Sequence, residues 1–179
     1  MRKARFGAIM AAVISLGMAS PAMAGEVYTG VYVQGVDTPF TLDVADQDGA
    51  AIQLGYRFSP VEGAWDIEPY VIASANTAGD SSFVGVGISK KFDLGSVYLR
   101  PGIGLVIQDQ NGARFDPITA DRTDLGSQVL FEPELAIGTQ LSERVSIEAS
   151  WVHISHATLF NSEQNPGVDL MGVRLNVKL

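Results

Sequence analysis

The sequence contains no cysteine and only two histidines among its 179 residues. The lack of cysteine excludes a disulfide framework, a thiol nucleophile and a cysteine-ligated metal site. Cations are also scarce, because 12 Lys and Arg face 20 Asp and Glu, and no cluster of Lys or Arg follows the first five residues. A nucleic-acid partner is therefore not expected, and the sequence offers no motif for a cofactor or a bound metal.

Long hydrophobic runs are missing as well, because no stretch after the N-terminus reaches the about 20 apolar residues of a membrane helix. Near the N-terminus, three cations precede an apolar segment that ends in the small-residue pattern Ala22-Met23-Ala24. This pattern is typical of a secretory signal peptide. We predict a signal peptide at residues 1–24 and one domain at residues 25–179, in which any membrane span must be a β-barrel.

The rest of the sequence contains eight segments in which apolar and polar residues alternate, and a period of two predicts β-strands. Short and long connections alternate along the chain, as they do in outer-membrane barrels. The exception is the connection at residues 76–81, which is short where a long one is expected. The predicted strands are Val27–Gly35, Ala51–Phe58, Ile67–Ala75, Ser82–Phe92, Ser96–Ile107, Gln128–Leu141, Val145–His156 and Val168–Leu179.

Charges of both signs occupy the polar face of these strands, whereas the other face is apolar. They are Arg57, Glu68, Arg100, Glu132, Glu134, Glu148, Arg174 and Lys178. Opposite charges that line the lumen of a small barrel explain this pattern better than the solvated face of a soluble sandwich. We predict an all-β fold, an eight-stranded antiparallel transmembrane β-barrel in the outer membrane of a Gram-negative bacterium. Three prolines within strands, Pro69, Pro101 and Pro133, count against this assignment.

Both histidines, His153 and His156, lie at the end of the seventh predicted strand, beside Ser155. Strand parity puts His153 and Ser155 on the apolar, lipid-facing side, with Cα atoms roughly 6.6 Å apart. If Val145 pairs with Val177 in a hairpin, Asp169 falls opposite His153 and can orient the imidazole. These three residues therefore form a candidate catalytic triad.

Two interpretations of this cluster stay open. Ionisable groups at membrane depth are often functional, which favours catalysis. Alternatively, a histidine beside Trp151 can belong to an interfacial aromatic belt. The second interpretation makes the protein a non-catalytic barrel, namely a structural protein, an adhesin or a narrow pore.

The segment from Trp151 to Val177 resembles the C-terminal signature of the outer-membrane lipid A 3-O-deacylases, the PagL family. The shared features are the His-x-Ser motif at residues 153–155, the sequence Asn165-Pro166-Gly167 and a final strand. The resemblance implies an ester hydrolase that acts on lipid A without a cofactor. It also implies that His153 is the base and Ser155 the nucleophile.

The resemblance also implies roles for residues that depart from the family pattern. Asp169 stands where the family has Glu, and Glu163 is its rival as the acid. His156 and Thr158 replace an Asn and a Gly associated with the oxyanion hole, so they are the oxyanion-hole candidates.

Two predictions about partners complete the analysis. Arg114 and Arg122 are the cations of the longest outer connection, and we expect one or both to bind a lipid A phosphate. Self-association into a homodimer is left open.

Overall fold

The computed structural model describes residues 25–38, 43–44, 47–109, 125, 127–157 and 166–179. The predicted signal peptide, residues 1–24, lies outside these residues and stays a prediction. Within the described part of the chain, no helix is long and apolar enough to cross a membrane.

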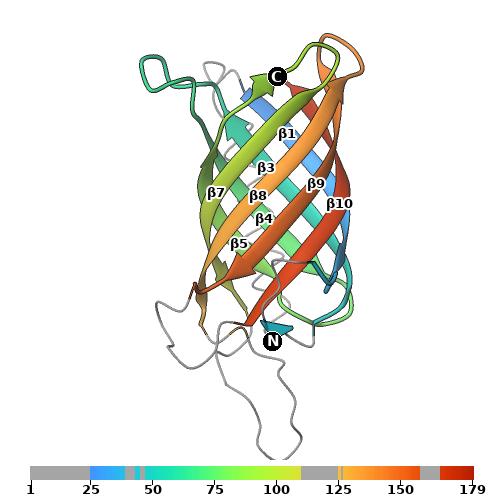
Figure 1. The fold of residues 1–179 in the computed structure, drawn as a ribbon. Helices are drawn as coiled ribbons and strands as arrows, with labels where there is room; N and C mark the ends of the chain where they lie inside the picture. The colour runs from blue at the N-terminus through green and yellow to red at the C-terminus, as the bar shows by residue number, and fades with distance from the viewer. Residues whose placement is uncertain (1–24, 39–42, 45–46, 110–124, 126, 158–165) are drawn as a thin grey trace, which may run out of the picture.

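The described residues form eight long antiparallel strands and two short ones (Figure 1). The first strand pairs with both the second long strand and the last, so the sheet closes into a barrel. The long strands are β1 (Gly25–Gln34), β3 (Gly49–Phe58), β4 (Glu68–Asn76), β5 (Phe83–Ser89), β7 (Tyr98–Gln108), β8 (Val129–Gln140), β9 (Val145–Ser155) and β10 (Pro166–Lys178).

Each of the two short strands pairs with one long strand of this barrel. β2 (Asp43–Val44) pairs in parallel with the start of β10, and β6 (Phe92–Asp93) pairs with β7. The predicted fold class is confirmed, and the ends of the predicted strands differ from the observed ones by at most three residues.

The outward face of the barrel is apolar, as the alternation predicts. Its side chains include Val31, Val33 and Val86, which are 60% to 66% exposed. The three prolines within strands, Pro69, Pro101 and Pro133, also take outward positions. Each lies in a strand that pairs with a neighbouring strand on both sides, so the prolines do not interrupt the barrel. Beside Pro133, however, the β8–β9 ladder has a gap between the pairs Phe131–Ser155 and Glu134–Val152.

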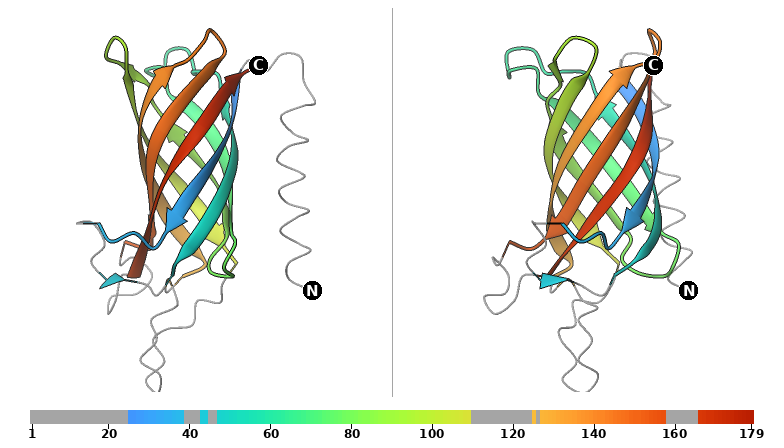
Figure 2. Two further views of the ribbon diagram at one scale, coloured as in Figure 1. Left: turned by 90° about the vertical axis from the view of Figure 1, so that its right-hand side faces the viewer. Right: turned by 45° about the vertical axis from the view of Figure 1, so that its right-hand side comes forward.

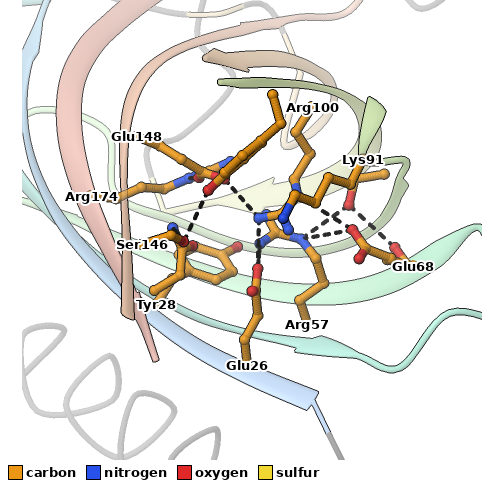
Figure 3. A network of polar contacts seen from close by, with 12 residues as sticks. Glu26, Tyr28, Arg57, Glu68, Lys91, Arg100, Ser146, Glu148 and Arg174 are labelled. Atoms are coloured by element: carbon orange, nitrogen blue, oxygen red, sulfur yellow. Dashed lines mark hydrogen bonds and ion pairs between the residues drawn. The ribbon is translucent and has the colours of Figure 1, made fainter. Parts of the chain in front are cut away.

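The lumen contains a charged layer, built from three arginines and five glutamates of the described residues (Figure 3). Arg174 bonds Glu148 and makes a bidentate pair with Glu134, at 2.8 and 3.3 Å. Arg100 donates to Glu26 and Glu148 at 2.6 and 2.7 Å. The remaining members are Arg57, Glu68 and Glu132, whereas Lys178, which was also predicted to face the lumen, is exposed at the end of β10.

A second, apolar layer fills the lumen toward the end where β9 ends and β10 begins, opposite the C-terminus (Figures 1 and 2). It includes Val152, Ile154, Val168 and Leu170, all at most 1% exposed. The sequence analysis did not predict this layer.

The charged layer predicts a large effect for removal of one arginine. Arg174→Leu leaves Glu134 and Glu148 without their main partner, so we expect the free energy of unfolding to fall by about 3–5 kcal/mol. Urea titration in detergent micelles measures this change. Lys178→Leu, at an exposed position of the same strand, serves as the control and should change it by less than about 0.5 kcal/mol. Equal effects of the two variants would contradict a structural role for the layer.

Candidate active site

The hairpin of β9 and β10 places the candidate residues on one face. Val145 pairs with Val177, and in the same register Asp169 pairs with His153. This is the register that the sequence analysis took as its condition for placing Asp169 opposite His153. Because side chains alternate along a strand, His153, Ser155 and Asp169 all take the outward face.

Asp169 and His153 are joined by a hydrogen bond of 2.8 Å between Oδ1 and Nδ1. A carboxylate accepts this bond, so Nδ1 carries the proton and Nε2 is left as an acceptor. The imidazole therefore holds the tautomer that a general base needs.

These polar groups are less exposed to lipid than their outward positions suggest. Asp169 is fully buried, Ser155 is 6% exposed and the His153 side chain is 12% exposed. The segment that follows β1 lies against Asp169, because the amides of Gly35 and Val36 donate to its backbone carbonyl at 3.0 and 3.2 Å and Thr38 donates to its carboxylate at 2.6 Å. The hydrogen bond from Thr38 lowers the cost of burying the carboxylate.

Ser155 lies two residues beyond His153 and pairs with Gly167 of β10 and Phe131 of β8. A Cβ added at Gly167 would lie 3.0 Å from the His153 Nε2 atom, so the imidazole leans over this glycine. Gly167 is also the strand partner of Ser155, so the imidazole and Ser155 both adjoin this glycine. The Ser155 hydroxyl makes no hydrogen bond with another described residue.

The sequence analysis missed three residues that shape this cluster. Gly167 leaves the space for the imidazole, and Trp151 and Thr38 donate hydrogen bonds to the Asp169 carboxylate at 2.8 and 2.6 Å. Gly167 was noted only as part of the family signature. No local sequence pattern identifies Thr38 as a partner of Asp169, because the two residues are 131 positions apart.

The remaining predicted site residues are less defined. His156 follows β9 and is fully buried, and neither of its ring nitrogens has a hydrogen-bond partner among the described residues. Thr158, Glu163, Arg114 and Arg122 lie outside the described residues. Among the described residues, no group of three or more His, Asp or Glu side chains is arranged to hold a metal ion.

An apolar groove of about 550 Å³ lies on the barrel wall formed by β4, β5, β7 and β8, and Phe131 lines it. Phe131 is the strand partner of Ser155, and a row of cross-strand partners continues from it through Leu105, Val86 and Val71, which also line the groove. The groove therefore begins one strand away from the candidate nucleophile.

Comparisons with known proteins identify the family and the fold. The family model for lipid A 3-O-deacylase (PagL) matches residues 45–178. The solved structure of the outer-membrane enzyme PagL is similar, with a TM-score of 0.62 and 16% identity, over 86% of this chain and 99% of that chain. Neisserial surface protein A (NspA) is similar with a TM-score of 0.54 and 13% identity, over 87% of this chain and 97% of that chain. No curated protein matches.

At these identities the solved structures establish the fold, an outer-membrane β-barrel, and the family match carries the assignment. That match extends over more than half of the chain and includes His153, Ser155 and Asp169. The chain therefore belongs to the PagL family of lipid A deacylases, which are ester hydrolases of the Gram-negative outer membrane.

Proposed function

We propose that this protein hydrolyses the ester-linked acyl chain at position 3 of lipid A, with Ser155 as nucleophile, His153 as base and Asp169 as acid. The observation that carries the proposal is the 2.8 Å bond from His153 Nδ1 to Asp169, on the strand face that also bears Ser155. This bond leaves Nε2 as the acceptor that the mechanism requires.

In the first half-reaction, the Ser155 oxygen attacks the ester carbonyl carbon while its proton passes to His153 Nε2. The tetrahedral intermediate then expels the sugar oxygen, which takes that proton from the imidazolium. The products are a deacylated lipid A and an acyl ester on Ser155. Asp169 stabilises the transient imidazolium across the existing hydrogen bond.

In the second half-reaction, water gives a proton to His153 and attacks the acyl ester. The fatty acid leaves, and the Ser155 oxygen recovers its proton from the imidazolium. All proton transfers use the same nitrogen, and Ser155, His153, Asp169 and water supply every reacting group of the proposed scheme.

The substrate reaches the site by lateral diffusion in the membrane. In this proposal, the acyl chain lies in the groove that begins at Phe131, where hydrocarbon already contacts the barrel. The lipid A phosphates remain above the bilayer. The proposed contacts from Arg114 and Arg122 to these phosphates stay a prediction.

His156 is the oxyanion-hole candidate that the described residues include. Its buried, unpartnered imidazole follows Ser155 directly, and a buried polar group without a partner is costly. A donor that is paired only when the oxyanion forms would explain this cost.

Replacement of the nucleophile or the base tests the mechanism. Ser155→Ala and His153→Ala should each lower the deacylation rate by at least about 10³-fold, because triad residues act as a unit. Mass spectrometry of lipid A from cells with each variant measures the product. Ser150→Ala, whose side chain faces the lumen from the same strand, is the matched control. A Ser155→Ala variant that keeps a tenth of the activity would exclude the covalent mechanism.

The identity of the acid is tested by a pair of variants. Asp169→Asn should slow hydrolysis by about 10⁴-fold, because the amide favours the wrong imidazole tautomer. Glu163→Gln should have little effect, since Asp169 already accepts the hydrogen bond from His153 Nδ1. Initial rates on purified lipid A distinguish the two. If Glu163→Gln proves the more damaging change, the acid is Glu163.

The oxyanion assignment predicts an order of activity at residue 156. His156→Leu fills the site without a donor and should lower kcat by about 10²-fold. His156→Asn restores a donor and should lose less. Both proteins should fold, because the imidazole forms no hydrogen bond that the variants would break. If the leucine variant is as active as the asparagine variant, the imidazole has no role in catalysis.

A further inference from the structure

The Asp169 carboxylate accepts hydrogen bonds from two side chains besides His153. Trp151 Nε1 donates to Oδ1 at 2.8 Å, and Thr38 Oγ1 donates to Oδ2 at 2.6 Å. We propose that Trp151 and Thr38 are positioning residues, which hold the carboxylate against His153 and so keep the imidazole in one tautomer. This inference rests on the proposed function, because it assigns Asp169 to the triad.

Trp151 acts on both members of the Asp169–His153 pair. Its indole N–H donates to the same Oδ1 atom that accepts the bond from His153. Its ring also stacks on the imidazole, with centroids 6.1 Å apart and an interplanar angle of 27°. The stacking restricts rotation of the imidazole, and the hydrogen bond restricts rotation of the carboxylate.

An aromatic belt residue would behave differently. A tryptophan that only anchors the barrel at the interface directs its N–H toward lipid headgroups. Here the N–H is directed at a fully buried carboxylate of the neighbouring strand. This direction of the N–H favours a role of Trp151 in the site over a purely interfacial one.

Thr38 reaches the site from the other side of β10. It follows β1, and β1 pairs with β10 up to the pair Gln34–Leu170. The ladder continues through the amides of Gly35 and Val36, which both donate to the Asp169 carbonyl. The backbone and the side chain of Asp169 are thus held by the same four-residue segment, 35–38.

The chemistry explains why two extra donors are useful. A carboxylate that rotates freely can lose its bond to Nδ1, and the imidazole can then carry its proton on Nε2, where it cannot accept one from serine. With Trp151 on Oδ1 and Thr38 on Oδ2, both oxygens are tethered. The triad is then assembled before substrate binds, so the two donors should affect kcat more than KM.

The test combines conservative variants with a spectroscopic measurement. Trp151→Phe keeps an aromatic ring and removes the N–H, and Thr38→Val removes the hydroxyl at nearly constant shape. Thr38→Ser should rescue the function, because it restores the donor. The matched controls are Trp65→Phe, which changes the second tryptophan, at an exposed position, and Thr29→Val, which removes a hydroxyl that bonds the Gln53 carbonyl.

The primary measurement is ¹⁵N NMR of histidine-labelled full-length protein in detergent micelles. The chain has two histidines, so His153→Ala assigns both imidazoles. In the wild type and both controls, His153 should be protonated on Nδ1. In the double variant Trp151→Phe/Thr38→Val, the spectrum should show a mixture of tautomers. A His153 resonance that is unchanged in the double variant would overturn the proposal.

Kinetics provide the second measurement. The double variant should lower kcat for lipid A by about tenfold to 100-fold, while KM changes by less than about twofold, as expected of residues that orient a catalytic group. An increase in KM at constant kcat would overturn the proposal, because it would assign the two residues to substrate binding. If the tautomer shifts as expected but the wild type does not hydrolyse lipid A, the positioning role is supported and the proposed function is wrong.

Discussion

The hydrogen bonds between β1 and β10 close the barrel, and much of the rest of the structure depends on them. Hydrocarbon offers no partners for backbone amides and carbonyls, so a sheet in the membrane is stable only without free edges. The closing ladder runs from Glu26–Lys178 to Gln34–Leu170. Its continuation brings the segment after β1 onto Asp169. The constraint that makes the barrel stable in lipid therefore also completes the site.

The lumen supports the strands that carry this site. Inward side chains of β9 and β10, among them Val152, Ile154, Val168 and Leu170, pack in the apolar layer directly behind the outward residues. Farther along the barrel, the charged layer links β10 to β8 and β9 through Arg174. A filled interior leaves little freedom for these strands to shift, which suits a site whose geometry must be held before substrate arrives.

Placing a polar site on the lipid side solves one problem and creates another. A lipid substrate need not leave the membrane, because its ester can meet Ser155 at the barrel surface. A carboxylate at that depth, however, is costly unless it accepts hydrogen bonds. The Asp169 carboxylate accepts them from His153 and Trp151 at Oδ1 and from Thr38 at Oδ2, and two amides bind its backbone carbonyl. The same contacts that remove the cost of burial orient the imidazole.

Local pattern was sufficient for much of the fold. Alternation locates all eight long strands, because the side-chain period of a strand is a local property. Alternation fixes only the parity of a strand pairing, so the pairing of Val145 with Val177 was an assumption. The structure has this pairing, and with it Asp169 lies opposite His153.

Contacts between distant residues were decided only by the closed barrel. Thr38 reaches Asp169 across 131 positions of the sequence, and no local pattern marks it as a donor. Trp151 could be read as an interfacial residue, since its spacing does not show where its N–H points. The apolar layer was missed because residues such as Ile72, Val106 and Leu130 become neighbours only when strands from opposite walls enclose one lumen. Periodicity assigns a side chain to a face of its strand, whereas its partners on that face depend on how the whole sheet curves and closes.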